Sequence, residues 1–343
     1  MGFKLGPVTT DDDKKEILNL WSRNLPSLSE KRLNWFYELN PVGNSQTIKA
    51  TTEDGDVIGS GSFFLQKLKV GNQVYKISTA SDFSIDEKYR LFGPALSIQK
   101  ELVRSIKDNQ DLFCGLAFPN KSGKGVFLRS GYIHLSDAEF WSIPLSSLKF
   151  WKSRINNSYA SLFLSLMADI FIRVFFKVTI KSLPGQISFS EIDSFDNKIN
   201  ELWARTNTEY DITTVRDSLF LNWRYINNPV DKYKVYVLKN ANQYLGYVVF
   251  KEVDSYYEIV DLYSENSIRT YTYIIQCMIR LAINNNMSSV CLSFVGNDKF
   301  KKVLKKNFFR LSSLVKRPLL ILTENENIIN SSRWYIYEGD MDL

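Results

Sequence analysis

"FSIDEKYRLFGPALSIQKELV", residues 83–103, joins an apolar strand to a helix through a short basic loop. Arg90, Gly93 and Ala95 form an R-x-x-G-x-A pattern in that loop. The helix is predicted to begin near Pro94, because proline suits the first helical turn. Glycine permits a tight backbone that turns N–H groups outward, and the following helix offers the partial positive charge of its N-terminus. This geometry suits a pyrophosphate.

A second feature is a repeated motif. LNWFYELNPV at residues 33–42 returns as LNWRYINNPV at residues 221–230, with Leu, Asn, Trp, Tyr, Asn, Pro and Val in register. Each copy is followed by a strand, a polar turn and a strand that carries a glycine (Gly59, Gly246). A longer strand, a helix, an apolar strand, a short helix and a final strand come next in both copies. The pattern predicts one mixed unit of about 130 residues used twice.

The predicted fold class is therefore α+β (mixed αβ), with two tandem domains, each a mixed, mostly antiparallel sheet flanked by helices. The length of 343 residues fits two domains of ordinary size. We expect an N-terminal domain over residues 1–145, a helical apolar linker over 146–187, and a C-terminal domain with an acidic tail over 188–343.

The linker contains LFLSLMADIFIRVFFKV, residues 162–178, which is too short and too charged for a comfortable membrane span. Two interpretations stay open: a helix buried between the domains, or an amphipathic helix in peripheral contact with a membrane surface. Asp169 and Arg173 are spaced i,i+4 and are predicted to pair on one face.

The charge pattern limits the partners. The net charge is +6, and basic residues are interleaved with acidic ones in place of long basic runs. We therefore expect no nucleic-acid partner. Where the basic residues have a function, we expect them to bind small anionic molecules. The N-terminus lacks the apolar core of a signal peptide, so the expected location is cytoplasmic. The sequence does not indicate an oligomeric state.

Cysteine and histidine usage narrows the chemistry. Cys114, Cys277 and Cys291 lie inside apolar runs at unpatterned spacings, as small core residues of a reduced protein do. His134 is the single histidine, so histidine-rich metal sites and catalytic dyads that need a further histidine are excluded. We expect no metal.

Residues 85–96 resemble the signature of the GCN5-related N-acyltransferase (GNAT) superfamily, through Ile85, Asp86, Tyr89, Arg90, Gly93 and Ala95. Downstream, FCGLAFPNKSGKGVFLRSGYIHL resembles the second signature of the superfamily, with Asn120 and the Gly131–Tyr132 pair in place. The likeness in layout covers most of residues 5–140 and, more weakly, residues 190–320. The RWYIYEGDMDL and RDSLFLNWRY stretches also resemble tandem GNAT proteins found with bacterial surface-polysaccharide genes.

The resemblance implies an acyl-CoA-dependent N-acyltransferase that uses acetyl-CoA or another acyl-CoA as co-substrate. Its acceptor would be the primary amine of a small molecule, for example an amino sugar or nucleotide sugar, which attacks the thioester directly. By the same resemblance, the pantetheine and thioester would lie along the backbone of Phe83, Ser84 and Ile85. The residues carried over as contacts to the phosphates and the rest of the coenzyme are Arg90, Leu91, Phe92, Gly93, Ala95, Leu96 and Asn120.

The proton-transfer residues depart from the family pattern. Asp82 is the carboxylate nearest to the expected thioester and is the candidate general base, with Asp340 and Asp342 of the tail as a second choice. Phe127 stands where the family usually has a tyrosine that acts as the general acid, and phenylalanine cannot donate a proton. Pro94 removes one N–H from the expected phosphate loop.

The second copy of the loop, VDLYSENSIRTYTYIIQC at residues 260–277, has no glycine. We therefore expect that the second domain does not bind coenzyme A and instead completes a substrate cleft or acts as a scaffold. Near the second motif, Arg216, Asp217, Arg224 and Tyr225 either line that cleft or form a solvated helix face.

Two other functions stay open. One is a Fem-like transferase, another tandem GNAT architecture, which moves an aminoacyl group from a charged tRNA; no coiled-coil insertion for tRNA is seen in the sequence. The other is a non-catalytic binding protein on a decayed GNAT fold, which the Phe127 and Pro94 departures favour.

Overall fold

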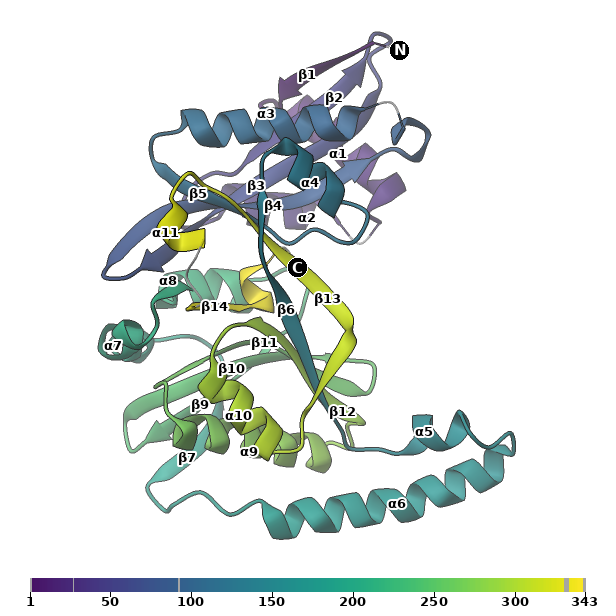
Figure 1. Cartoon of the computed structure of the whole chain (residues 1–343), viewed down its shortest axis with the longest axis vertical. Coiled ribbons are helices and arrows are strands. Elements are labelled where there is room, and N and C mark those ends of the chain that lie inside the picture. Colours follow the sequence, from purple (N-terminus) through teal and green to yellow (C-terminus); the bar gives the residue numbers. More distant parts are fainter. Residues whose placement is uncertain (1, 27, 92, 330–332, 342–343) are drawn as a thin grey trace. The chain divides into compact units, whose positions relative to one another are not determined.

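The computed structural model describes residues 2–26, 28–91, 93–329 and 333–341 (Figure 1). The chain forms two compact units that are discontinuous in sequence. Unit 1 comprises Met1–Ala138, Asp211–Lys232 and Lys316–Leu343, and unit 2 comprises Glu139–Tyr210 and Tyr233–Val315. The units therefore differ from the expected ranges 1–145 and 188–343, because segments of the second half of the chain belong to unit 1.

The sheet of unit 1 has the strand order β1-β2-β3-β4-β5-β13. A short strand, β8, pairs with the end of β3, and β14 pairs with β8. The bounds are β1 (Phe3–Pro7), β2 (Gln46–Thr52), β3 (Val57–Val70), β4 (Gln73–Ile85), β5 (Leu112–Ala117), β8 (Ile212–Thr214), β13 (Arg310–Leu322) and β14 (Trp334–Tyr337).

The sheet of unit 2 has the order β7-β9-β10-β11-β12-β6. The bounds are β6 (Ile133–Pro144), β7 (Ile187–Ile192), β9 (Lys234–Asn240), β10 (Gln243–Val253), β11 (Tyr256–Ser264) and β12 (Ser289–Val295). In both sheets, three antiparallel pairings are followed by one parallel and one antiparallel pairing. The mixed αβ class expected from the sequence is confirmed.

Two strands are exchanged between the sheets: β6, from the first half of the chain, pairs in the sheet of unit 2, and β13, from the second half, pairs in the sheet of unit 1. Strand β6 follows β5 in the chain, yet its residues Glu139–Pro144 pair with β12 of unit 2. Strand β13 follows β12, yet its residues Leu320–Leu322 pair with β5 of unit 1. This exchange, which a repeat pattern does not reveal, is one reason why each unit takes segments from both halves of the chain.

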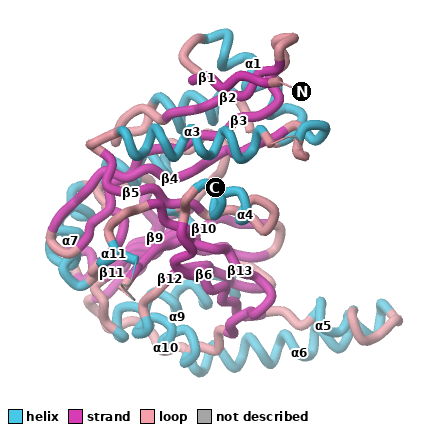
Figure 2. The backbone as a smooth tube through the Cα atoms, turned by 45° about the horizontal axis from the view of Figure 1, so that its top comes forward, coloured by secondary structure: helices cyan, strands magenta, loops and turns pink. Residues whose placement is uncertain are grey.

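Helices flank both sheets, and Figure 2 shows α3 lying along one face of the sheet of unit 1. Its buried residues Ile98, Leu102 and Ile106 join the core formed with β2, β3 and β4. The helices of unit 1 are α1 (Asp11–Asn24), α2 (Glu30–Leu33), η1 (Asn34–Glu38), η2 (Glu87–Tyr89), α3 (Pro94–Asp108), α4 (Lys124–Ser130), α8 (Ser218–Leu221), η4 (Asn222–Ile226), α11 (Glu326–Ile329) and η5 (Glu338–Asp340). Those of unit 2 are α5 (Leu148–Lys152), α6 (Ser158–Thr179), α7 (Asn197–Thr206), η3 (Asn207–Glu209), α9 (Ile268–Asn284) and α10 (Asp298–Lys306).

The two glycines noted in the repeat occupy equivalent places. Gly59 pairs with Ile85, the last residue of β4, and Gly246 pairs with Ser264, the last residue of β11. A Cβ at Gly59 would lie 2.6 Å from the side chain of Ile85, and one at Gly246 would lie 2.4 Å from Cβ of Ser264. Gly246 therefore needs glycine, because Cβ of Ser264 and the backbone oxygen of Tyr263, at 2.9 Å, come too close for any side chain, whereas at Gly59 the tip of the Ile85 side chain would have to move.

The repeated motif forms the same local structure twice, and both copies lie in unit 1. Each is one α-helical turn (α2, α8) followed by a π-helical turn (η1, η4). The indole Nε1 of Trp35 donates to the carbonyl oxygen of Trp223 at 2.9 Å, and Nε1 of Trp223 donates to the carbonyl oxygen of Trp35 at 3.0 Å. The two rings stack with centroids 5.1 Å apart. Both tryptophans therefore have a structural role, in joining the two copies of the motif.

We predict that Trp35→Phe and Trp223→Phe each destabilise unit 1 by about 1–3 kcal/mol, because each leaves a buried carbonyl without its donor. In a double-mutant cycle the two changes should couple by roughly 0.5–3 kcal/mol. Urea unfolding followed by fluorescence measures both quantities. Trp151→Phe is the control, because the indole nitrogen of Trp151 has no partner among the described residues. Strictly additive effects would contradict the reciprocal pairing.

Candidate functional site

Strands β4 and β5 separate at one end of unit 1. Their parallel pairing ends at Thr79 and Leu116, whereas β4 continues to Ile85. On its other edge, β4 has a bulge, because the pairing with β3 shifts between Ser62↔Ser81 and Ser60↔Ser84. The divergence leaves the edge of β4 beyond Thr79 without a ladder partner from β5.

A pocket of about 160 Å³ lies at this divergence. The aromatic walls are Phe83 and Phe127, whose rings meet edge to face with centroids 5.8 Å apart. Asn120 also lines the pocket, and its Oδ1 accepts a hydrogen bond from the backbone N–H of Gly123 at 2.8 Å. The complete lining is Ala80, Ser81, Asp82, Phe83, Phe118, Pro119, Asn120, Gly123 and Phe127.

The loop between β4 and α3 has the expected form. Strand β4 ends at Ile85 and α3 begins at Pro94, as the sequence predicts. Gly93 adopts the left-handed conformation, with φ of +91°, and precedes the helix as an N-cap with no side-chain hydrogen bond. The N–H groups of Ala95 and Leu96 lie in the first turn, where no intrahelical acceptor exists. The N-terminus of α3 thus presents donors and a positive dipole end.

The other loop residues from the sequence hypothesis differ in their surroundings. Arg90 is exposed, and its Nε donates to the carbonyl oxygen of Ile85 at 3.3 Å. Leu91 is 94% exposed. Phe92 lies outside the described residues. Ser84 and Ile85 are buried and pair with β3, so of the three expected thioester contacts Phe83 is the one that lines the pocket.

Asp82 lies in the bulge with φ of +44°, a conformation that aspartate tolerates better than most residues. Its Oδ1 accepts a hydrogen bond from Nη2 of Arg32 at 3.0 Å, and its Oδ2 accepts one from the hydroxyl of Tyr37. The side chains of Arg32 and Asp82 are 4% and 3% exposed. The candidate base is thus one member of a buried network.

Tyr37 connects this network to a second pocket, of about 240 Å³. The same ring lines that pocket, together with Trp21, Lys14 and Glu38. Lys14 and Glu38 form an ion pair at its edge. Tyr37 therefore lines the second pocket, while its hydroxyl contacts the Asp82 carboxylate of the first pocket.

Tyr132 beside Phe127, and Cys114 close to Tyr132, are poor proton donors. Burial raises the pKa of the Cys114 thiol to about 12, and burial, with Cys114 close by, raises the pKa of Tyr132. Tyr132 packs edge to face on Phe127, with centroids 5.3 Å apart. Both groups therefore hold their protons more firmly than free side chains do, and they act as core residues.

The equivalent loop of unit 2 is built differently. The N-terminus of α9 is capped by the side chain of Ser267, whose oxygen accepts from the N–H of Thr270 at 3.0 Å. The N–H of Asn266 donates to Oε2 of Glu209 at 2.5 Å. An internal hydroxyl and an internal carboxylate thus take donors that an anionic ligand would need.

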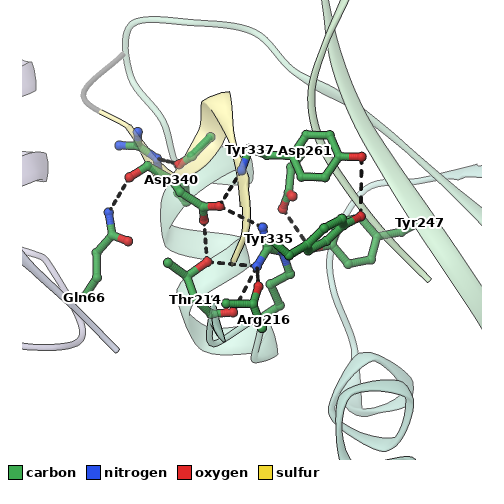
Figure 3. Close-up of polar contacts among 11 residues, drawn as sticks. Gln66, Thr214, Arg216, Tyr247, Asp261, Tyr335, Tyr337 and Asp340 are labelled. Atoms are coloured by element: carbon green, nitrogen blue, oxygen red, sulfur yellow. Dashed lines mark hydrogen bonds and ion pairs between the residues drawn. The ribbon is translucent and has the colours of Figure 1, made fainter. Parts of the chain in front are cut away.

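The acidic tail is part of the buried structure of unit 1 (Figure 3). Oδ2 of Asp340 accepts from Nη2 of Arg216 at 2.9 Å, and Oδ1 accepts from the hydroxyl of Thr214 at 2.5 Å. Nε2 of Gln66 on β3 donates to the carbonyl oxygen of Asp340 at 2.9 Å. Asp340 is therefore held in a structural network and, unlike Asp82, does not line the pocket at the divergence of β4 and β5. Asp342 lies outside the described residues.

The residues near the second motif do not form a solvated face, so that interpretation is wrong. Arg216, Arg224 and Tyr225 are buried. Nε of Arg224 donates to the carbonyl oxygen of Gly339 at 3.0 Å, and Asp217 caps α8 by accepting from the N–H of Phe220 at 2.8 Å. The polarity of a residue in the sequence does not distinguish a solvated charge from a charge buried against main-chain oxygens.

Sequence analysis missed Arg32 and Tyr37. The one available signal was an arginine and a tyrosine in the first copy of the motif region, spaced i,i+5. Only the π-helical turn brings both side chains to the same carboxylate, some fifty residues further along the chain, so the pattern alone did not predict the contact.

Comparison with solved structures identifies the fold. A conserved protein of Enterococcus faecalis, described as a probable N-acyltransferase, matches with a TM-score of 0.67 at 12% identity over 94% of this chain and 73% of its own. A GCN5-related N-acetyltransferase from Anabaena variabilis matches with 0.65 at 13% identity over 93% and 72%. N-myristoyltransferase of Saccharomyces cerevisiae with bound myristoyl-CoA gives 0.59 at 11% identity over 93% and 82%. The chain thus has the fold of GCN5-related N-acetyltransferases. No protein-family profile and no curated protein sequence matches it.

We predict that Arg32→Met destabilises unit 1 by about 3–5 kcal/mol, because it leaves the Asp82 carboxylate buried without its cation. The double variant Arg32→Met/Asp82→Asn should recover part of that loss. Urea unfolding measures the difference. Lys15→Met is the control: Lys15 pairs with Asp12 on the exposed surface of α1, so its loss should leave the midpoint unchanged. Equal midpoints for Arg32→Met and the wild type would refute the buried pair.

Proposed function

We propose that the protein is an acyl-CoA-dependent N-acyltransferase whose site lies in unit 1. The observation that carries the proposal is the sequence of features along one strand. Strand β4 separates from β5, bulges at Asp82, and leads into a left-handed Gly93 at an N-terminus with no side-chain cap. Unpaired strand amides suit a thioester arm, and donors at a helix N-terminus suit a diphosphate.

The residues present fit the coenzyme in two places. The first-turn N–H groups of Ala95 and Leu96, beside exposed Gly93 and Arg90, would hold the diphosphate even though Pro94 offers no donor. Backbone N–H groups near Phe83, at the divergence, would polarise the acyl carbonyl. The pocket volume of about 160 Å³ is smaller than the ~300–1,000 Å³ of sites that enclose a whole ligand. A short acyl group such as acetyl is therefore favoured.

For proton removal we propose a relay. The acceptor would enter through the pocket lined by Tyr37 as an ammonium ion and give one proton to the Tyr37 hydroxyl oxygen, while that hydroxyl gives its own proton to Oδ2 of Asp82. The resulting neutral amine would then attack the thioester. Arg32 keeps Asp82 oriented, as a positioning residue. The thiolate leaves without a side-chain acid, since Phe127 cannot supply a proton.

For the acceptor we propose the primary amine of a small molecule, with amino sugars and nucleotide sugars as the first candidates on the sequence resemblance. Unit 2 would be a second, degenerate copy of the domain. Its loop is closed by Ser267 and Glu209, so it would act as scaffold and not as a second coenzyme site.

We predict that the protein binds acetyl-CoA with a micromolar to sub-millimolar dissociation constant, measured by isothermal titration calorimetry. Gly93→Asp should weaken binding about tenfold or more, because it places a negative charge at the diphosphate site. Gly55→Asp is the matched control. Gly55 has φ of +94°, and a Cβ at either glycine would meet no atom within 4 Å. No heat of binding, or equal affinity in wild type and Gly93→Asp, would reject the proposal.

We predict that Tyr37→Phe lowers kcat by about 10²–10⁴-fold, as loss of a proton-transfer group does, with KM for acetyl-CoA unchanged. Release of free thiol from acetyl-CoA over a panel of small amines measures turnover. Binding of acetyl-CoA without turnover on any amine would instead indicate a binding protein.

A further inference from the structure

Helix α6 has its polar face turned inward. Ser161, Ser165 and Asp169 follow one another at four-residue spacing and so share one face. Oδ1 of Asp169 accepts from the N–H and the hydroxyl of Ser147 at 2.6 and 2.9 Å, and Oδ2 accepts from the hydroxyl of Ser146 at 2.8 Å. The carboxylate thus holds α6 to the start of α5 within unit 2. The i,i+4 pair of Asp169 with Arg173 expected from the sequence is replaced by these contacts.

The opposite face of α6 is apolar and exposed. In the most apolar 18-residue window of this helix, 17% of the residues are buried, whereas a core helix is mostly buried. Phe171 is 69% exposed and Phe163 is 64% exposed. The alternative of a helix buried between domains is therefore wrong for this face. The exposed side chains that form its centre are Phe163, Leu166, Ile170, Phe171, Val174 and Val178.

This arrangement inverts the usual pattern, in which a helix turns its apolar side to the core and its polar side to water. A continuous apolar surface of this kind marks a contact with something other than water. Among the described residues, α6 is the one helix long and apolar enough to cross a membrane.

The attachment of α6 along one side favours a helix that lies flat. Nη2 of Arg173 donates to Oδ1 of Asn286 at 2.8 Å, and Nη2 of Arg280 donates to the carbonyl oxygen of Ile180 at 3.3 Å. Phe176 packs edge to face against Phe308, with centroids 6.0 Å apart. Because unit 2 holds α6 from Asp169 to its last turn, the helix offers one face and would have to detach in order to span a bilayer. Figures 1 and 2 show α5 and α6 next to each other along the edge of unit 2.

The charged residues around α6 indicate which kind of surface its apolar face would contact. Between residues 146 and 181 the single acidic residue is Asp169, which faces inward. Lys152 and Arg154 are exposed just before α6, and Lys177 is exposed in its last turn. An apolar centre with cations at both ends complements anionic headgroups above an acyl-chain layer. The basic residues of the segment are Lys149, Lys152, Arg154, Arg173, Lys177 and Lys181.

We propose that the exposed face of α6 docks on an anionic lipid bilayer and lies in the interfacial region, so that the protein works at a membrane surface. The proposal is independent of the acyltransfer site, which is built from residues of unit 1. It predicts that acceptors carried on or near a membrane are more accessible to the protein than acceptors in bulk solution.

The test is flotation of the full-length protein with vesicles. We expect binding to phosphatidylcholine vesicles that contain roughly 30% phosphatidylglycerol, weaker binding to phosphatidylcholine alone, and a decrease with added salt. Phe163→Ser/Phe171→Ser should lower the partition coefficient about tenfold or more, because two aromatic anchors are lost. Lys152→Gln/Lys177→Gln should reduce only the preference for the anionic vesicles.

The matched control is Ile268→Ser/Leu311→Ser, which removes two apolar side chains of unit 2 that are each 51% exposed. This variant should float like the wild type. Acetyl-CoA binding, measured in parallel, should be equal in all variants, which separates failure here from failure of the proposed function. Absence of flotation, or flotation unaffected by Phe163→Ser/Phe171→Ser, overturns the proposal. So does a dimer by light scattering that this double variant converts to monomer, because the face would then belong to a second copy.

Discussion

Two tryptophans that exchange hydrogen bonds hold the architecture together. Trp35 and Trp223 are 188 positions apart, and each indole satisfies the main-chain carbonyl of the other. Closing so long a loop costs conformational entropy, which stacking and two buried hydrogen bonds help to offset. Because this contact places residues 211–232 in unit 1, it also brings Arg216 and Arg224 to the tail that they bind. This contact is one cause of the discontinuity of the units, and the exchange of β6 and β13 is another.

Local structure could be predicted from the sequence, and long-range pairing could not. The end of β4 at Ile85, the start of α3 at Pro94 and the left-handed glycine before it follow from proline and glycine geometry, which neighbouring residues determine. The exchange of β6 and β13 between sheets depends on contacts across the whole chain, and both strands have patterns compatible with either sheet. The Arg32–Asp82 pair was missed for the same reason.

The two strand–loop–helix segments show how one topology can leave a helix N-terminus without a side-chain cap or provide it with one. Both sheets have the same order and polarity, so the backbone scaffold is equally available in each. A helix N-terminus has few free N–H donors. A serine one residue before the helix accepts a hydrogen bond from one of them, and because this serine is part of the chain, it loses no binding entropy as a separate ligand would. Ser267 does this in unit 2, whereas Gly93 has no side chain to do so in unit 1. The difference lies in capping and not in fold.

Helix α6 illustrates a limit of periodicity arguments. An amphipathic pattern separates two faces, but it does not say which face turns to the protein. Here Asp169 decides the orientation, because a carboxylate with three close donors from Ser146 and Ser147 is satisfied only when the polar face turns inward. Burying the apolar face instead would expose the serines but strip Asp169 of these donors at the start of α5. The satisfied charge therefore fixes the apolar face outward, where its exposure to water is unfavourable.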